Sequence, residues 1–356
     1  MPLRMRSNAI FCPLAVGFTV VLALVSVDRS LFAAPQASPA AAVEGLSRDL
    51  ARAAGRKEWD AAVAVARQLA AARPGSAPDA YNLACMLARA GKGEEAVAAL
   101  MQSAELGFAF TSTLLRDEDL DPVREHAGYA SALDRIRGNN SAELEVAKPR
   151  LAKAPLLTFA PKTTPQRTAT GPLPLIVALH GYGGTPEPIA ELYRASASRL
   201  GAILVVPRGQ ETVGRGFGWG IVEQAEYLVL QAIDRAAAER PVGPVVLTGF
   251  SQGAGVALTM ARRYPGKFAG VVAVAGWFEE RLAPVPLRVL TPFPRFAFLN
   301  GELDEAAANN RRSAKQLDKA GAAVRVRIYP GLGHEFPPVE ERDRELEQAL
   351  RFALGI

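Results

Sequence analysis

The sequence is poor in cysteine and aromatic residues, and it contains no long run of one charge sign. Of its 356 residues two are cysteine, and aromatic side chains make up 7%. Cys12 lies in an expected export signal, so Cys85 is the only thiol of the remaining chain and no internal disulfide is expected. The net charge is +5, but no block of Lys and Arg is longer than two, which leaves nucleic-acid binding unsupported.

The N-terminus has the pattern of an export signal. Arg4 and Arg6 precede an apolar stretch over residues 13–27, which is followed by the small-residue-rich segment "SLFAAPQASPA". At 15 residues the apolar stretch is short for a membrane span. We therefore expect a signal peptide over residues 1–33, cleaved after Ala33, and a periplasmic or secreted protein. The alternative is a membrane anchor formed by an uncleaved N-terminal segment.

An alanine-rich helical domain is expected over residues 44–140, after a flexible linker over residues 34–43. The segments "EWDAAVAVARQLAAARP" and "GEEAVAALMQSAELG" align Ala62 with Ala96, a spacing of 34 residues. This period, with small residues where paired helices approach, resembles the tetratricopeptide repeat. The alternative is a generic alanine-rich helical hairpin. In either case the domain is expected to be a packing or partner-binding surface, and His126 a surface residue.

From residue 173 the pattern changes to short apolar runs alternating with helix-length segments. Strands are expected over residues 175–180, 202–207, 244–250, 270–276, 295–301 and 324–330, and helices over 187–200, 223–239, 252–264 and 305–320. This alternation predicts the α/β class, a mostly parallel sheet with helices on both faces. Residues 141–172 are expected to be a linker with possible first strands, and residues 173–356 a catalytic domain. In such sheets ligands bind beyond the carboxyl ends of the strands.

A candidate nucleophile follows one of these expected strands. "GFSQGAG", residues 249–255, places Ser251 between glycines, as in the G-x-S-x-G nucleophile elbow, although Gly and Ser are also common in turns. The elbow requires an acid and then a histidine later in the chain. His334, in "GLGHEF", is the only histidine after Ser251. His180 precedes the serine and is expected to be structural.

The acid must lie between the serine and the histidine. The carboxylates in that interval are Glu279, Glu280, Glu302, Asp304, Glu305 and Asp318. Asp304, in "NGELDE", follows the expected strand over residues 295–301, where a carboxylate can orient an imidazole. Glu279, which follows the preceding strand, is the alternative.

Two backbone N–H groups are expected to form an oxyanion site. "LHGYGG", residues 179–184, closes the first strong strand, and its glycines allow backbone N–H groups to face a ligand. The expected donors are the N–H groups of Gln252 and Tyr182, with Gly183 as the alternative to Tyr182.

Aromatic residues at strand ends are candidates for a substrate pocket. Phe217 and Trp219 lie in the glycine-rich "GRGFGWG", and Trp277 follows the strand over residues 270–276. They are expected to line an apolar pocket, or alternatively to pack against neighbours only. The proline-rich stretch over residues 283–296 is interpreted as a rim of the site.

These motifs, in this order, resemble the α/β-hydrolase superfamily, and most closely its phospholipase/carboxylesterase group, over roughly half the chain. The resemblance implies that Ser251 is the nucleophile, His334 the general base and acid, and Asp304 the residue that orients it. It also implies that neither a metal nor an organic cofactor is needed. The implied substrate is a small-molecule, lipid or polymer ester, with a protein partner possible through the repeats. The alternatives are a serine peptidase of the prolyl-oligopeptidase type and an inactive helical-repeat adaptor.

Overall fold

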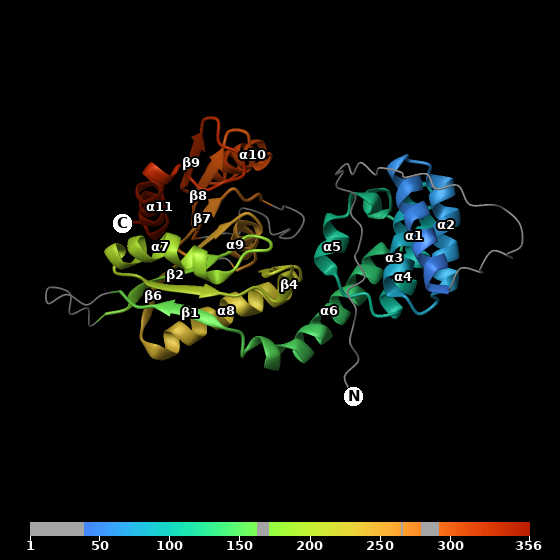
Figure 1. Ribbon diagram of the computed structural model, residues 1–356, viewed down its shortest axis with the longest axis horizontal. Helices are drawn as coiled ribbons and strands as arrows, with labels where there is room; N and C mark the ends of the chain where they lie inside the picture. Colours follow the sequence, from blue (N-terminus) through green and yellow to red (C-terminus); the bar gives the residue numbers. More distant parts are fainter. Residues whose placement is uncertain (1–38, 162–170, 265, 279–291) are drawn as a thin grey trace, which may run out of the picture. The chain divides into compact units, whose positions relative to one another are not determined.

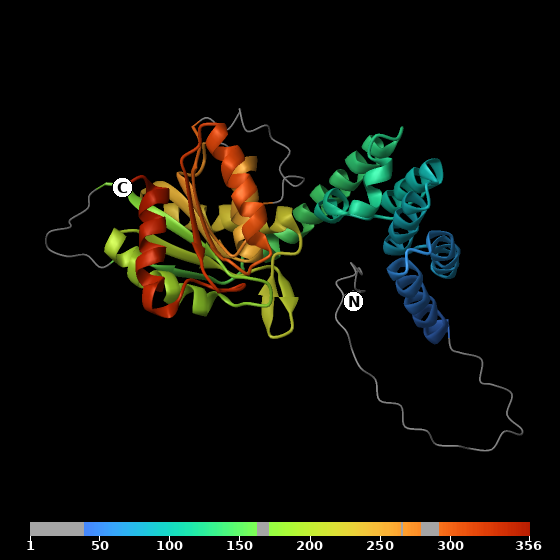
Figure 2. The same cartoon turned by 90° about the horizontal axis from the view of Figure 1, so that it is seen from above.

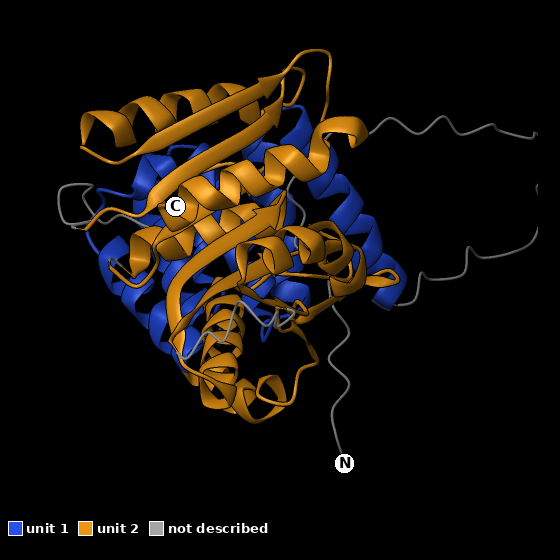
Figure 3. Ribbon diagram, turned by 90° about the vertical axis from the view of Figure 1, so that its left-hand side faces the viewer, with its two compact units in different colours: residues 1–141 blue, residues 142–356 orange. Residues whose placement is uncertain are grey.

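The computed structural model describes residues 39–161, 171–264, 266–278 and 292–356, which form two compact units. Unit 1 covers Met1–Ser141 and unit 2 covers Ala142–Ile356, and Figure 3 marks them in different colours. Helix α6 (Tyr129–Leu151) begins in the first unit and ends in the second. The expected signal peptide and most of the proline- and threonine-rich stretch before residue 173 lie outside the described residues.

Unit 1 is built from helices, and its buried core combines many alanines with larger apolar side chains. Its elements are α1 (Pro39–Gly55), α2 (Trp59–Ala72), α3 (Ala77–Arg89), α4 (Gly93–Glu105), α5 (Thr111–Arg116), the 3₁₀ helix η1 (Glu118–Val123) and the first part of α6 (Figure 1). Ala62 and Ala96, which align at the 34-residue spacing, are both fully buried. A side chain of this size allows paired helices to approach closely. The start of α1 at Pro39 corrects the expected linker, whose last five residues are helical.

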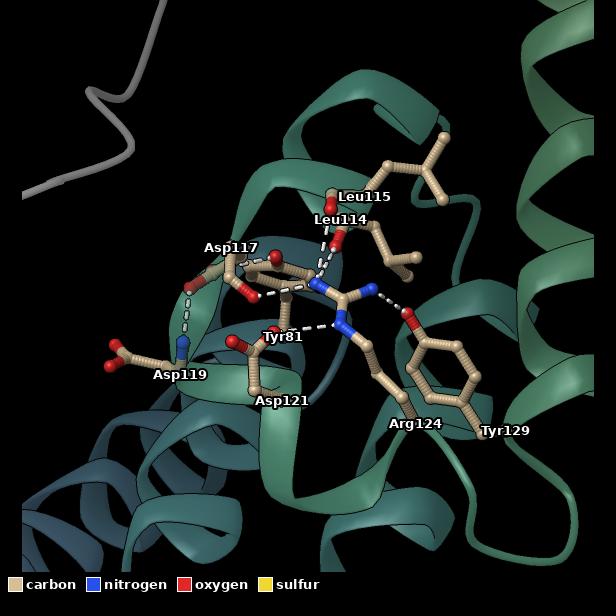
Figure 4. Close-up of polar contacts among 8 residues, drawn as sticks. All are labelled: Tyr81, Leu114, Leu115, Asp117, Asp119, Asp121, Arg124 and Tyr129. Atoms are coloured by element: carbon tan, nitrogen blue, oxygen red, sulfur yellow. Dashed lines mark hydrogen bonds and ion pairs between the residues drawn. The ribbon is translucent and has the colours of Figure 1, made fainter. Parts of the chain in front are cut away.

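A single arginine closes the C-terminal end of the short helix α5 (Figure 4). The Arg124 guanidinium donates to the carbonyl oxygens of Leu115 at 3.0 Å and Asp117 at 2.9 Å. It also donates to the Tyr129 hydroxyl at 2.8 Å and pairs with the Asp121 carboxylate at 2.8 Å. The last carbonyls of a helix have no partner within the helix. Arg124 supplies that partner and also ties the connecting segment to α6.

The polar cluster beside Arg124 includes the one cysteine among the described residues. Cys85 is buried, and its thiol lies 3.4 Å from the Asp117 carboxylate, which also accepts a 2.7 Å hydrogen bond from Tyr81. Burial, followed by the nearby Asp117 charge, raises the pKa of the Cys85 thiol well above its usual range. The thiol therefore stays protonated and unreactive. His126, expected at the surface, is half-buried, and its ring packs against Gly93.

Unit 2 contains a seven-stranded sheet in the order β1-β3-β2-β6-β7-β8-β9. Its strands are β1 (Leu156–Phe159), β2 (Leu173–Leu179), β3 (Ile203–Pro207), β6 (Val242–Phe250), β7 (Gly270–Val274), β8 (Arg295–Gly301) and β9 (Val324–Tyr329). All neighbouring strands are parallel except β1, which runs antiparallel to β3. The predicted fold class, a mostly parallel α/β sheet preceded by helices, is confirmed.

Helices cover both faces of this sheet (Figures 1 and 2). Helices α7 (Pro186–Leu200) and α11 (Val339–Leu354) pack on one face, and α8 (Val222–Glu239), α9 (Gln252–Arg263) and α10 (Ala306–Lys319) on the other. Along β2, Leu175 and Val177 belong to the second face, whereas Ile176 and Ala178 belong to the first. A strand buried on both faces is expected to be a continuous apolar run, which is why these strands are evident in the sequence.

The segment before β2 and the glycine-rich stretch after β3 depart from the expectation. The expected linker with possible first strands over residues 141–172 is instead helical as far as Leu151, and it then contains the edge strand β1. The glycine-rich stretch forms a separate hairpin of β4 (Glu211–Val213) and β5 (Gly216–Gly218). Strands of three residues carry too little periodicity to be seen in a sequence. Among the helices of the described ranges, none combines the length and apolar character needed to cross a lipid bilayer.

Glu226 is a buried carboxyl at the contact of α8 with α9. It is 3% exposed, accepts a 3.0 Å hydrogen bond from the Tyr264 hydroxyl, and lies 3.0 Å from the Arg263 guanidinium. Burial raises the pKa of Glu226 from 4.5 to about 7, although Arg263 and Tyr264 act in the opposite direction. Between pH 4.5 and about pH 7 the carboxyl of Glu226 is protonated in the folded chain and ionised in the unfolded chain. The free energy of unfolding therefore falls as the pH rises through this range.

We predict that Glu226→Gln weakens the dependence of unfolding on pH. Between pH 5 and pH 8, the free energy of unfolding of wild-type protein should fall relative to that of the variant by on the order of 1–3 kcal/mol. The reason is that wild type has a buried carboxyl that must ionise, whereas the variant has a neutral amide. Unfolding by urea at the two pH values measures the difference. Glu239→Gln, an exposed position on the same helix, is the control and should behave as wild type. An unchanged pH difference in Glu226→Gln would show that Glu226 does not titrate in this range.

Candidate active site

Ser251 lies at a sharp turn between β6 and α9, in a backbone conformation that is rare for a residue with a side chain. Its φ is 52° and its ψ is −120°. Its backbone N–H donates to the Val274 carbonyl at 2.9 Å, and its own carbonyl accepts from the Gly255 N–H at 3.1 Å. Such conformations persist only where the surroundings enforce them, and they concentrate at functional sites. The turn therefore has the geometry of the nucleophile elbow.

The glycines on either side of Ser251 are required by close backbone contacts. A Cβ atom at Gly249 would lie 2.5 Å from the carbonyl carbon of Gly253. A Cβ atom at Gly253 would lie 2.5 Å from the carbonyl oxygen of His180. Helix α9 thus begins directly against the ends of β6 and β2, and no side chain fits between them.

His334 and Asp304 form a hydrogen-bonded chain with Ser251. The Ser251 Oγ atom lies 2.8 Å from His334 Nε2, and His334 Nδ1 lies 3.2 Å from Asp304 Oδ2. The carboxylate faces Nδ1, so the proton belongs on Nδ1 and Nε2 can accept the serine proton. Asp304 Oδ1 accepts a further 2.9 Å hydrogen bond from the Ala306 N–H, and the carboxylate is buried. The structure thus brings together the three residues that the sequence selects.

The loops that carry Asp304 and His334 are tied to each other at the end of the sheet. The Leu303 N–H donates to the Leu332 carbonyl at 2.9 Å, and the Glu302 N–H donates to the Tyr329 carbonyl at 2.9 Å. A Cβ atom at Gly301 would overlap the Leu332 carbonyl oxygen. The β9–α11 loop therefore crosses directly over the end of β8, which sets the position of His334 relative to Asp304.

Two backbone N–H groups are available beside Ser251. The loop after β2 passes the serine closely, since a Cβ at Gly181 would lie 3.4 Å from Ser251 Cβ. Within the described residues, neither the Tyr182 N–H nor the Gln252 N–H makes a hydrogen bond. The Gly183 N–H, proposed from sequence as the alternative donor, is already bonded to the Phe217 carbonyl at 2.9 Å. That hydrogen bond makes Gly183 the wrong alternative.

The three aromatic residues expected to line a pocket lie in different surroundings. Trp277 is 36% exposed and lines a cavity of about 520 Å³. Trp219 is 2% exposed, and its indole N–H donates to the His180 carbonyl at 2.8 Å, so its assignment to the pocket is wrong. Phe217 is half-buried in β5 under the Arg208 guanidinium, 4.4 Å from the ring centre, and does not line this cavity. Folding of the glycine-rich loop into a hairpin turns these two rings away.

The cavity adjoins the hydrogen-bonded chain of Ser251. Its lining is Trp277, Leu303, Asp304, Glu305, Ala306, Asn309 and His334. Leu303 and Asn309 were missed by sequence reasoning. Leu303 directly precedes Asp304, and Asn309 lies on the first turn of α10. This closeness in sequence to Asp304 could have indicated that both residues lie near the site. The alternative acid Glu279 and most of the proline-rich stretch over residues 283–296 lie outside the described residues.

His180 is a buried, neutral histidine. Its Nε2 accepts the Gly209 N–H at 3.0 Å, and its Nδ1 lies 2.8 Å from the Gly181 carbonyl oxygen. An N–H can only donate and a carbonyl can only accept, so the ring carries its proton on Nδ1. Burial lowers the pKa of His180 below 6.5. In the part of the chain that the structure describes, no group of three or more His, Cys, Asp or Glu could hold a metal ion.

Residues 220–343 match the family model described as Phospholipase/Carboxylesterase. The acyl-protein thioesterase 1 of Gibberella zeae is 33% identical over 115 residues, which are 30% of this chain and 47% of that protein. The match thus spans about half the length of this curated relative. The resemblance of unit 2 to the phospholipase/carboxylesterase group is confirmed.

Two similar solved structures each cover somewhat more than half of this chain. The carboxylesterase of Bacillus cereus is 18% identical, with 59% of this chain and 99% of that chain covered and a TM-score of 0.44. The acyl-protein thioesterase 2 of Zea mays is 18% identical, with 57% of this chain and 100% of that chain covered and a TM-score of 0.42.

We predict that Gly301→Ala displaces the β9–α11 loop, which carries His334. The new methyl group would overlap the carbonyl oxygens of Leu332 and Gly333, so the loop must move and take His334 away from Ser251. The unfolding temperature should fall by several degrees, about 2–4 °C per kcal/mol, and Ser251 should react more slowly with a fluorophosphonate.

Gly333→Ala is the matched control for this substitution. No atom lies within 4 Å of a Cβ at that position, so its unfolding temperature should remain that of wild type. Equal unfolding temperatures and labelling rates for Gly301→Ala and Gly333→Ala would contradict the proposed contact.

Proposed function

We propose, since residues 220–343 match the phospholipase/carboxylesterase family, that the protein is a serine hydrolase that cleaves carboxylic esters through an acyl-enzyme. The observation that carries this proposal is the hydrogen-bonded chain from Ser251 through His334 to Asp304, with Ser251 on a strained turn at the end of β6. Nucleophile, base and orienting acid then each come from the carboxyl end of a different strand, where ligands bind in parallel sheets.

In the acylation step, Ser251 attacks the carbonyl carbon of the ester. His334 Nε2 accepts the hydroxyl proton as the Oγ–C bond forms, and Asp304 stabilises the imidazolium that results. The carbonyl oxygen becomes negatively charged and is stabilised by the N–H groups of Tyr182 and Gln252. His334 then gives its proton to the departing alkoxide, so the alcohol leaves and the acyl group remains on Ser251.

Deacylation repeats the sequence with water as the nucleophile. His334 removes a proton from water, whose oxygen attacks the acyl carbon, and the same two N–H groups stabilise the second tetrahedral intermediate. Collapse of that intermediate breaks the bond to Ser251, which recovers its proton from His334. The products are an alcohol and a carboxylic acid, and the protein returns to its starting state.

The acyl group is the part of the substrate that this site recognises best. The cavity beside His334 has an apolar wall of Trp277, Leu303 and Ala306, and the first two are 36% and 69% exposed. Apolar surface that is left accessible next to a reactive centre favours a hydrocarbon acyl chain. An acyl-enzyme forms equally from an oxygen ester or a thioester, so small-molecule, lipid and polymer esters and acyl thioesters are the proposed substrate classes.

We further propose that the protein acts after export, in the periplasm or outside the cell. The support is the sequence pattern over residues 1–33, with two arginines before a short apolar stretch and small residues after it. The helical unit 1 contributes none of the three hydrogen-bonded residues Ser251, His334 and Asp304. We propose that unit 1 binds a protein partner.

We predict that Ser251→Ala abolishes hydrolysis of short p-nitrophenyl esters and leaves the fold intact. Loss of a nucleophile of this kind lowers kcat on the order of 10⁴–10⁶-fold. A fluorophosphonate should label wild-type protein at Ser251, as mapped by mass spectrometry, and should not label the variant. Circular dichroism of both proteins controls for unfolding. Labelling of another residue, or retained turnover in the variant, would remove Ser251 from the mechanism, and an unlabelled and inactive wild type would favour the adaptor alternative.

We predict that a chain starting at Ala142 retains turnover of a small soluble ester. Every residue assigned to the reaction lies between positions 180 and 334, and the α6 residues Leu144, Ala147 and Leu151 pack in the core of unit 2. The measurement is kcat/KM on a p-nitrophenyl ester for full-length and shortened proteins, with circular dichroism as the control. A folded but inactive shortened protein would show that unit 1 completes the active site.

A further inference from the structure

Trp219 makes two hydrogen bonds that link the two segments bearing the oxyanion donors. Its indole N–H donates to the His180 carbonyl at 2.8 Å. Its backbone N–H donates to the side-chain oxygen of Gln252 at 3.0 Å. His180 comes two residues before the Tyr182 donor, and Gln252 carries the other donor. A single buried residue therefore connects both halves of the oxyanion site.

The segment before Tyr182 is fixed further by the ring of His180. That ring packs against the Trp219 indole with centroids 4.8 Å apart, and its Nε2 accepts the Gly209 N–H at 3.0 Å. Gly209 comes just before the β4–β5 hairpin. The His180 ring and its carbonyl are thus both held by residues that flank this hairpin.

The segment after Tyr182 is held by the hairpin backbone. The Gly183 N–H donates to the Phe217 carbonyl at 2.9 Å, and the Phe217 N–H donates to the Gly184 carbonyl at 2.8 Å. Tyr182 therefore lies between two attachments, one to Trp219 and one to Phe217, which are two positions apart in the chain. Its own N–H remains free of such bonds within the described residues.

We infer that Trp219 is a positioning residue that holds the Tyr182 and Gln252 N–H groups in the geometry needed to bind an oxyanion. The inference rests on the proposed function of Ser251. Donors stabilise a developing charge efficiently only when they are fixed before the reaction, because they then need no reorganisation. Only substitution by proline removes a backbone N–H, and proline also changes the backbone, so the residues that hold the donors are the accessible test of their role.

The experiment removes each hydrogen bond of Trp219 separately in the full-length protein. Trp219→Phe keeps an aromatic ring and the backbone N–H but loses the indole donor. Gln252→Met keeps the length of the side chain and the N–H of the donor but loses the acceptor. Titration with a fluorophosphonate gives the fraction of active sites, so kcat is expressed per active site. A trifluoromethyl ketone, which adds to the serine as an oxyanion, reports on binding of that charge.

Each variant should lower kcat per active site by about 10-fold, less than the 10²–10³-fold expected for complete loss of a donor. KM should change by less than about 2-fold, because the interaction is made in the transition state. The inhibition constant of the ketone should rise by about the same factor as kcat/KM falls, as expected for a transition-state analogue. A purely structural role would instead lower the active fraction and leave kcat per active site unchanged.

Trp59→Phe, the same substitution in unit 1, is the matched control and should leave all three quantities unchanged. If Trp219→Phe does not fold, Gln252→Met carries the test, because Gln252 is half-buried at the start of a helix. Normal kcat per active site and ketone binding in the folded variants would overturn the inference while wild-type turnover upholds the proposed function. A wild type that neither reacts with the fluorophosphonate nor hydrolyses esters would overturn both.

Discussion

The site depends on one steric constraint, which is that backbones meet at the carboxyl end of the sheet with no room for a side chain. Helix α9 begins against the ends of β6 and β2, where Gly249 and Gly253 leave the necessary space. The β9–α11 loop, which carries His334, crosses the end of β8 at Gly301 in the same way. These close backbone contacts fix the positions of Ser251 and His334 relative to each other. A shift of about 1 Å in a reacting group is costly to catalysis, so close packing here serves chemistry as well as stability.

The electrostatic arrangement of the site builds on this packing. Asp304 has both carboxylate oxygens occupied, one by the Ala306 N–H and one by His334, so its charge is directed at the imidazole. His334 itself is exposed, which suits the proton exchange with substrate and water that we propose for it. His180 shows the opposite treatment: it is buried, neutral and bonded on both nitrogens. Two histidines of one unit thus lie in opposite surroundings, and the proposed proton transfer falls to the exposed one.

Sequence reasoning was accurate where a physical signal is local, and it failed where tertiary contacts decide. Continuous apolar runs revealed strands such as β6 and β8 because strands buried on both faces need no alternation. The order of serine, acid and histidine selected residues that the structure brings within hydrogen-bonding distance. In contrast, nothing local shows that the Gly183 N–H is already bonded, or that Trp219 turns inward as a hydrogen-bond donor. The three-residue strands of the β4–β5 hairpin likewise exist only because their partners are present.

The positive φ of Ser251 sets stability and reactivity against each other at one position. A residue with a Cβ atom is disfavoured in this conformation by about 1–3 kcal/mol, whereas glycine adopts it freely. The sequence at this turn would therefore drift toward glycine if folding alone determined it. Under the proposed function, a serine occupies this position for its hydroxyl at the expense of the fold, and the surrounding core must be stable enough to tolerate it.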